Sequence, residues 1–368
     1  MTYDPLEPMT GSGTPLTVGS VCTGYGGLDL AVCAVLGARP AWVADPNPGA
    51  ARILAHRFPR VPNLGDITAV NWDTTPPVDI LTAGFPCQDL SYAGRGAGIK
   101  EGTRSGLWLT IAHALGVLRP RLIVLENVAA IVARRPGLDI VAADLAALGF
   151  DAEWTCVRAS DVGAPHRRER WFCLAWPADP GSPRLEGGRL RDAHDVGGHW
   201  GWPRRPGRDE PAAHGLPAAY APRIGAGEPA DQAHPVAGGW TPWPVPGCGS
   251  GRAAADPDQS RQRAHESDLR AGQPDSDWGD YGPAILRWEA ITGRAAPRPT
   301  DHRRRLTPVF VEWLMGLPPG WVTDTPGLTR NQQLHALGNG VLPAQAIAAL
   351  HALLPAYEQA TATLGVAS

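Results

Sequence analysis

Residues 17–37 read TVGSVCTGYGGLDLAVCAVLG, and this stretch decides the fold. An apolar run over 17–22 predicts a strand, the apolar residues of 28–37 predict a helix, and glycines fill the connection at 23–27. A glycine turn at such a place lets the backbone approach a ligand closely and points helix-terminal N–H groups at it. The stretch therefore predicts the start of an α/β domain that binds a ligand where its first strand ends.

The same alternation of strand and helix continues along the chain. We expect strands at 17–22, 41–44, 78–83, 121–125, 153–159 and 170–175, and helices at 28–37, 48–57, 107–118 and 138–148. Repetition of this kind predicts a mainly parallel sheet that is covered by helices on both faces.

After Pro177 the composition changes. Residues 177–300 are dense in glycine, proline, arginine and aspartate, and much of 178–275 is expected to be mobile. A chain of 368 residues has room for a second, smaller domain beside the first. Helical patterns return at 281–292, 308–315 and 343–354.

The chain carries 33 basic and 36 acidic residues, a formal net charge of −3. Binding to a nucleic acid would therefore depend on a local basic face. The six cysteines show no Cys-x-x-Cys pair and no zinc-ligand spacing, so we expect reduced thiols and no metal site. Without an apolar leader or a run of about 18 apolar residues, the sequence predicts a soluble, cytoplasmic protein with no membrane partner.

Two reactive side chains follow predicted strands. Residues 84–91, Gly-Phe-Pro-Cys-Gln-Asp-Leu-Ser, place Cys87 at the carboxyl end of the strand 78–83. Glu126 ends the strand 121–125 in the same way. Open α/β sheets bind their ligands at this edge, so we expect the two side chains to share one site.

An acidic residue marks the other half of this site. Asp45 follows the second strand, 21 residues after Gly24. At this distance an acid conventionally accepts hydrogen bonds from ribose hydroxyls. The glycines do not form Gly-x-Gly-x-x-Gly, which argues against a dehydrogenase.

Together these motifs resemble those of the DNA cytosine-5 methyltransferases of bacterial and phage type. The resemblance covers about 17–176 and 305–347. Its further motifs are Gly65-Asp66-Ile67, Arg119-Pro120, Leu125-Glu126-Asn127-Val128, the segment 163–170, the segment 305–318 and Leu337-Gly338-Asn339-Gly340-Val341-Leu342-Pro343.

The resemblance implies a fold and a domain plan. We expect an S-adenosylmethionine-dependent methyltransferase sheet, which is Rossmann-like, with a smaller target-recognition domain. The implied divisions are a disordered lead-in at 1–16, a catalytic domain at 17–176 completed by 335–355, a target-recognition domain at 177–334 and a C-terminal tail at 356–368. Arginines and tryptophans of 177–304 are candidates for contacts to DNA bases, although scattered tryptophans are more often core residues.

The family's chemistry, carried over by position, gives four residues a role. Cys87 attacks carbon 6 of a cytosine flipped out of duplex DNA, and Glu126 donates a proton to N3. Arg168 contacts the flipped base, and Arg170 braces the site and Glu126. The loop 91–106 closes over the DNA.

The implied cofactor is S-adenosylmethionine. The residues expected to bind it are Thr23, Gly24, Tyr25, Gly27, Asp45, Asp66, Ile67, Gly84, Pro86, Leu107, Asn339, Gly340 and Val341.

The sequence departs from the family pattern at three places. Ser20-Val21-Cys22 stands where Asp-Leu-Phe is usual, so an aromatic ring that commonly stacks on adenine is missing. Asp45 replaces the commoner glutamate, and His166 replaces the usual glutamine. These changes bear on the detailed contacts.

Two alternatives remain at this point. An RNA cytosine-5 methyltransferase would carry similar motifs, but the long variable region favours a reader of DNA. A catalytically inactive DNA-binding relative is the other, and the intact catalytic set argues against it. We expect a monomer that acts on duplex DNA, and a cognate restriction endonuclease in the same cell is the protein partner that the resemblance suggests.

Overall fold

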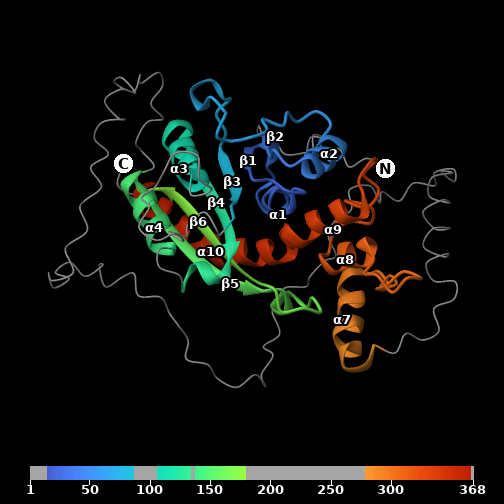
Figure 1. Cartoon of the computed structure of the whole chain (residues 1–368). Helices are drawn as coiled ribbons and strands as arrows, with labels where there is room; N and C mark the ends of the chain where they lie inside the picture. Colours follow the sequence, from blue (N-terminus) through green and yellow to red (C-terminus); the bar gives the residue numbers. More distant parts are fainter. Residues whose placement is uncertain (1–14, 87–105, 134–136, 180–277, 366–368) are drawn as a thin grey trace, which may run out of the picture. The chain divides into compact units, whose positions relative to one another are not determined.

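The computed structural model describes residues 15–86, 106–133, 137–179 and 278–365 (Figure 1). All of them belong to one compact unit, which comprises residues 1–182 and 242–368. Cys87, nearly all of the predicted loop 91–106 and most of the predicted target-recognition domain lie outside the described residues.

The described residues contain a six-stranded sheet in the order β2-β1-β3-β4-β6-β5. Its strands are β1 (Thr17–Val21), β2 (Arg39–Ala44), β3 (Ile80–Gly84), β4 (Leu122–Val128), β5 (Phe150–Arg158) and β6 (Glu169–Pro177). The pairs β1–β2, β1–β3 and β3–β4 are parallel, whereas β6 runs antiparallel to both β4 and β5. The expected mainly parallel sheet is thus confirmed. A direct connection between β5 and β6 explains the exception, because neighbouring strands joined without a long crossover pair antiparallel.

Helices cover both faces of this sheet, as expected. The first four are α1 (Gly27–Leu36), α2 (Pro48–Arg57), α3 (Gly106–Leu118) and α4 (Leu138–Ala147). Alternate strand residues point to opposite faces. Leu81 and Ile123 lie in one core cluster with residues of α3 and α4, whereas Ile80 and Val124 lie in another with residues of α1.

The C-terminal part contributes four more helices and a third core cluster. The helices are α7 (Gly282–Thr292), α8 (Pro308–Leu314), α9 (Arg330–Asn339) and α10 (Pro343–Gly365). Short 3-10 turns occur at Trp72–Thr74, Ala129–Ile131, Ala159–Val162 and Gly279–Tyr281. In the third cluster Trp288, Trp313 and Trp321 pack with Tyr25, in the loop after β1, and with Phe58, just after α2. The C-terminal part therefore shares a core with the first part of the sheet domain.

Several element ends differ from the prediction, and two of these differences concern Glu126 and the last helix. β4 continues to Val128, so Glu126 lies inside the strand, where it pairs with Phe172 of β6. α10 continues through Pro355 to Gly365 instead of ending at 354. Proline removes one backbone hydrogen bond from a helix. Packing beyond that point offsets this loss, since the ring of Tyr357 lies 5.8 Å from that of Trp176.

Helix α9 was not predicted. Its sequence is polar, and Leu337 is its only fully buried residue among those described. A local signal was nevertheless present, because Thr329 and Gln332 form a capping box at its start.

The stretch Arg330–Ala362 is long and apolar. By length and composition, Arg330–Ala362 could cross a membrane, but buried helices of soluble proteins pass the same test. Half of its most apolar window is buried in the protein, where α10 packs against α1, β5 and β6.

Candidate active site

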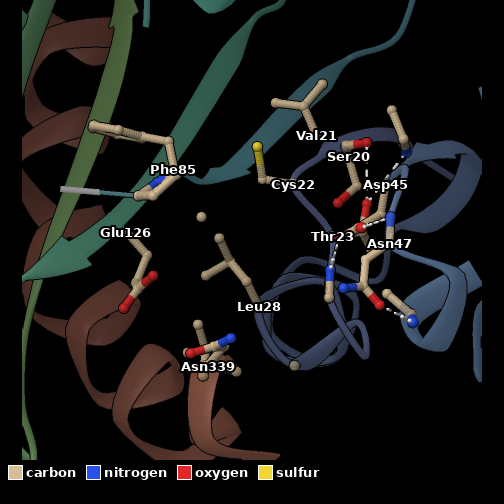
Figure 2. A pocket seen from close by; sticks show the side chains of 18 of the residues that line it. Ser20, Val21, Cys22, Thr23, Leu28, Asp45, Asn47, Phe85, Glu126 and Asn339 are labelled. Atoms are coloured by element: carbon tan, nitrogen blue, oxygen red, sulfur yellow. Dashed lines mark hydrogen bonds between the residues drawn. The ribbon is translucent and has the colours of Figure 1, made fainter. Parts of the chain in front are cut away.

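A cavity of about 780 Å³ opens where β1, β2, β3 and β4 end. The loop between β1 and α1 forms one wall, and the connection between α9 and α10 forms another. Figure 2 shows Asp45 and Glu126 on opposite sides of this space, with Leu28 between them. A pocket at the carboxyl ends of parallel strands is where α/β folds bind ligands.

The glycine loop and Asp45 are held to each other. Gly24 N–H donates to Asp45 Oδ2 over 2.8 Å, and Asn47 N–H donates to Asp45 Oδ1 over 2.9 Å. Gly24 has a φ of 61°, in the left-handed region that favours glycine, and a Cβ there would meet open space. Burial raises the pKa of Asp45, although these two hydrogen bonds oppose the shift. The carboxylate is thus fixed at the edge of the cavity.

Further residues complete the wall on the side of Asp45. Thr68 donates to Asp66 Oδ1 through its backbone N–H and its hydroxyl, and Ile67 beside it is buried. Asn339 Nδ2 lies 3.0 Å from His335 Nε2, and both residues line the cavity. The predicted residues that line it are Thr23, Gly24, Gly27, Asp45, Asp66, Ile67, Gly84, Pro86, Leu107, Asn339, Gly340 and Val341.

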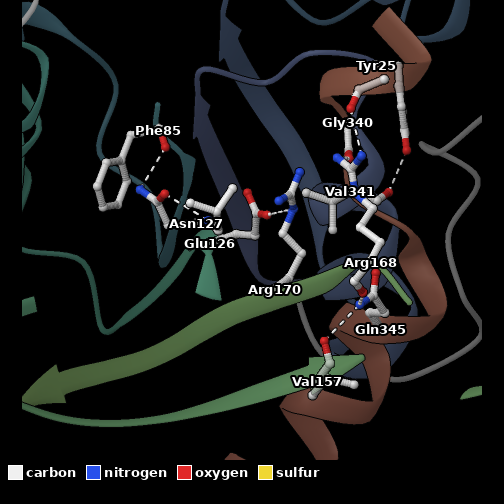
Figure 3. Close-up of polar contacts among 12 residues, drawn as sticks. Tyr25, Phe85, Glu126, Asn127, Val157, Arg168, Arg170, Gly340, Val341 and Gln345 are labelled. Carbon is white, nitrogen blue, oxygen red and sulfur yellow. Dashed lines mark hydrogen bonds and ion pairs between the residues drawn. The ribbon is translucent and has the colours of Figure 1, made fainter. Parts of the chain in front are cut away.

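Glu126 and Arg170 form a buried ion pair at the opposite wall. Arg170 Nε lies 2.8 Å from Glu126 Oε1, and the two side chains are 13% and 8% exposed (Figure 3). Burial raises the pKa of Glu126 to about 7, although the charges of Arg170 and Arg168 lower it. A carboxyl group with this pKa can hold or release a proton near neutral pH.

Asn127 links this wall to the strand that leads to Cys87. Its Nδ2 donates to the carbonyl oxygen of Phe85 over 2.9 Å, and its Oδ1 accepts from Val128 N–H. The ring of Phe85 packs against Trp108 with centroids 5.1 Å apart. Asn127 therefore fixes the backbone two residues before Cys87, which itself lies outside the described residues.

Arg168 is tied to the α9–α10 connection. It is not among the residues that line the cavity, and it donates through Nη1 to the carbonyl of Gly338 and through Nη2 to that of Gly340, both over 2.7 Å (Figure 3). These contacts join the start of β6 to the α9–α10 connection. The expected contact with a flipped base stays a prediction.

Tyr25 also lies outside the cavity lining. Tyr25 is fully buried, and its hydroxyl donates to the carbonyl of Val341 over 2.6 Å. The carbonyl of Tyr25 accepts from Trp321 Nε1. A Cβ at Gly340 would overlap the Tyr25 ring, which accounts for glycine there. Through these contacts Tyr25 holds two walls of the cavity together, and its expected contact with the cofactor stays a prediction.

Asp29 is a cavity residue that the sequence reasoning missed. Its carboxylate accepts from the hydroxyls of Ser20 over 3.0 Å and Thr82 over 2.6 Å. Burial raises its pKa, opposed by these hydrogen bonds. An acid within the apolar run of α1 was the available signal, because a buried acid needs partners.

The mainly parallel sheet with one antiparallel strand, β6, and a pocket at its carboxyl edge is the fold that the chain shares with solved methyltransferase structures. Among solved structures, the chain is similar to the S. pombe Dnmt2 methyltransferase, with 15% identity, a TM-score of 0.52, and coverage of 90% of this chain and 96% of that one. It is also similar to a putative DNA modification methyltransferase of an E. coli prophage, with 21% identity, a TM-score of 0.50, and coverage of 92% and 99%.

Sequence comparison finds a matching family model. Residues 16–183 match the model described as C-5 cytosine-specific DNA methylase. Relatives include the type II methyltransferases M.CviJI of Paramecium bursaria Chlorella virus IL3A, 33% identical over 37% of this chain, and M.NlaIV of Neisseria lactamica, 34% identical over 36%. The matches cover 37% and 33% of those proteins, so the chain spans about a third of the curated relatives' length.

Proposed function

We propose that this protein transfers a methyl group from S-adenosylmethionine to carbon 5 of a cytosine flipped out of duplex DNA. The observation that carries the proposal is the buried Glu126–Arg170 pair, which faces a cavity whose other wall holds Asp45. A proton donor with a pKa near 7 and a ribose-type acid in one cavity suit a nucleoside cofactor beside a base that must be protonated.

The wall formed by Asp45, Asp66 and Ile67 fits S-adenosylmethionine. Asp45 is already oriented by two backbone N–H groups, so its oxygens are positioned to accept from ribose hydroxyls. Asp66 offers an acceptor for an adenine amino group, and Ile67 offers an apolar face for the ring. When bound, the cofactor supplies an electrophilic methyl group.

Cys87 and Glu126 would activate the base. Addition of the Cys87 thiolate to carbon 6 forms a C–S bond and pushes an electron pair of the ring toward N3, where Glu126 delivers its proton. Carbon 5 of the resulting enamine then takes the methyl group. Glu126 then takes back the N3 proton, solvent water takes the carbon 5 proton, and loss of the thiolate restores the aromatic ring.

Arg170 has two effects in this scheme. Its charge keeps the Glu126 side chain oriented, and it lowers a pKa that burial alone would raise further. Glu126 is thereby poised to give up a proton near neutral pH, where general acids work best.

The partners follow from the same chemistry. The substrate is duplex DNA, and the type II relatives suggest a cognate restriction endonuclease in the same cell. We propose that the protein acts as a cytoplasmic monomer.

A trapping experiment tests the proposal. Duplex DNA carrying 5-fluorocytosine should form a stable adduct in the presence of the cofactor, because fluorine cannot leave carbon 5 after methylation. Cys87→Ala should abolish the adduct, whereas Cys156→Ala, at an exposed thiol, should not. Base-resolution methylation sequencing of DNA from a methylation-free host would locate the target. Methylation of RNA alone would favour the RNA alternative, and an adduct formed by Cys87→Ala would refute the mechanism.

A further inference from the structure

The acidic chain presents a compact basic hairpin at residues 299–307. Thr300 and Leu306 form an antiparallel bridge, and Thr307 N–H donates to the carbonyl of Pro299 over 2.9 Å. Asp301 N–H also donates to the carbonyl of Arg305 over 2.9 Å. The hairpin therefore has a backbone held from one end to the other.

Asp301 shapes the tip of this hairpin. Its Oδ1 accepts from the backbone N–H groups of Arg303 and Arg305, and its Oδ2 accepts from the Arg305 guanidinium. The hydrogen bond from the Arg305 backbone is the main reason that the pKa of Asp301 falls to about 2. Asp301 thus stays ionised and neutralises Arg305, which leaves the charges of Arg303 and Arg304 uncancelled within the tip.

Arg303 and Arg304 point their charge at solvent. Both are exposed, and neither side chain has a hydrogen bond or ion pair to the described residues. Arg304 adopts a φ of 59°, where glycine would be easier to accommodate.

The hairpin is anchored to the wall of the cavity. Arg330, the first residue of α9, donates through Nη2 to the carbonyl of Leu306 over 2.6 Å. The other end of α9 carries Asn339, which lines the cavity. A helix of ten residues is about 15 Å long. That length corresponds to about four nucleotides along one DNA strand, which are spaced by about 3.4 Å.

We infer that the hairpin 299–307 binds the phosphate backbone of duplex DNA through Arg303 and Arg304, a few nucleotides from the base in the cavity. The inference rests on the proposed function for the identity of the partner. The hairpin supplies the local basic face that a chain with a net charge of −3 needs to bind a nucleic acid. Phosphate contacts of this kind position a duplex without reading its sequence.

The test measures how strongly DNA binding depends on salt. A short fluorescent duplex of unrelated sequence is titrated with the full-length protein at several salt concentrations. The plot of log affinity against log salt has a negative slope. For Arg303→Gln/Arg304→Gln the magnitude of this slope should decrease by about 1.8, since each lost phosphate contact removes about 0.9. At moderate salt the dissociation constant should rise by about tenfold.

Two further variants keep the result interpretable. Arg39→Gln/Arg121→Gln removes the same charge from exposed positions at the opposite, amino-terminal end of the sheet, and it should leave the slope unchanged. Arg304→Gly removes a charge and suits the left-handed backbone, so it should decrease the magnitude of the slope by about 0.9 without lowering the melting temperature.

The outcomes separate this inference from the proposed function. If the wild type methylates duplex DNA but the hairpin variants keep its salt slope, the inference is wrong and the proposed function stands. The inference is also wrong if the hairpin variants lose affinity for single-stranded RNA and none for duplex DNA. A slope of smaller magnitude for both hairpin variants, with the control unchanged, supports the inference even if methylation is not detected.

Discussion

At the scale of single residues, Glu126 is placed to deliver a proton, and replacing it tests that role. Glu126→Gln keeps the shape of the side chain but has no transferable proton. We expect methylation to slow by about 10²- to 10⁴-fold, the usual contribution of general acid catalysis, while DNA binding survives. The matched control is Glu153→Gln, at an exposed position of β5. A single-turnover rate within about threefold of the wild type would assign Glu126 to structure.

The pKa of Glu126 also predicts a pH dependence. Because the acid acts in its protonated form, the rate should fall as the pH rises through about 7, where the folded protein loses this proton. The charge of Arg168 lowers this pKa. Arg168→Gln should therefore shift the alkaline fall in rate to higher pH, whereas Arg168→Lys, which keeps the charge, should not. The profile is measured at saturating cofactor, and equal profiles for both variants would contradict this electrostatic coupling.

A third residue-scale prediction concerns the cofactor. Asp45→Ala would leave the ribose hydroxyls without acceptors, at a cost of about 1–3 kcal/mol, or roughly 10- to 100-fold in affinity. Calorimetric titration with S-adenosylmethionine measures this directly. Asp73→Ala, at an exposed turn away from the cavity, is the control. An unchanged affinity for Asp45→Ala would remove Asp45 from the cofactor site.

Residue types that follow strands were predictable, whereas long-range contacts were not. Glu126 and Asp45 could be placed at one edge of the sheet because local patterns locate strand ends. The contact from Arg168 to Gly340 joins residues 172 positions apart, and that from Tyr25 to Val341 joins residues 316 apart. No local pattern encodes such pairs, so motif position alone could not predict these contacts.

At the scale of elements, the α9–α10 connection is held against the sheet by side chains from elsewhere. Arg168 holds the carbonyls of Gly338 and Gly340, and Gln345 Nε2 donates to the carbonyls of Val157 and Arg168 (Figure 3). This connection brings Gly340 and Val341 to the cavity. Its position should therefore control cofactor affinity.

Arg168→Lys tests this control. Lysine keeps the charge but cannot reach both carbonyls with one planar group, and a charged hydrogen bond contributes about 1.5–3 kcal/mol. We expect the dissociation constant of S-adenosylmethionine to rise about tenfold or more, with little change in the rate at saturating cofactor. Arg167→Lys, at the exposed neighbouring position, is the control. A variant with normal affinity but a reduced maximal rate would instead favour contact with the base.

At the scale of the whole molecule, the order of strands and helices up to α4 follows from sequence periodicity. The third core cluster does not, because it joins distant segments. Ile285 and Trp288 of α7 pack with Phe310 and Trp313, and Trp288 Nε1 donates to the carbonyl of Trp313 over 2.9 Å. α7 lies within the predicted target-recognition domain, yet its packing ties it to the helices that line the cavity. Composition alone could not show that Trp288 is a core residue.

This packing decides where a specificity exchange should be cut. An exchange of all of 177–304, the stretch whose arginines and tryptophans are candidates for base contacts, would remove α7 from the core that it shares with α8 and would separate Trp288 from Trp313. We therefore expect an exchange of 180–277 alone, from a relative with a known and different target, to move methylation to the donor's site while the chimera melts near the wild-type temperature. The longer exchange should melt lower. Methylation sequencing reads the outcome, and a folded, active chimera that still modifies the original site would place recognition within the residues that were kept.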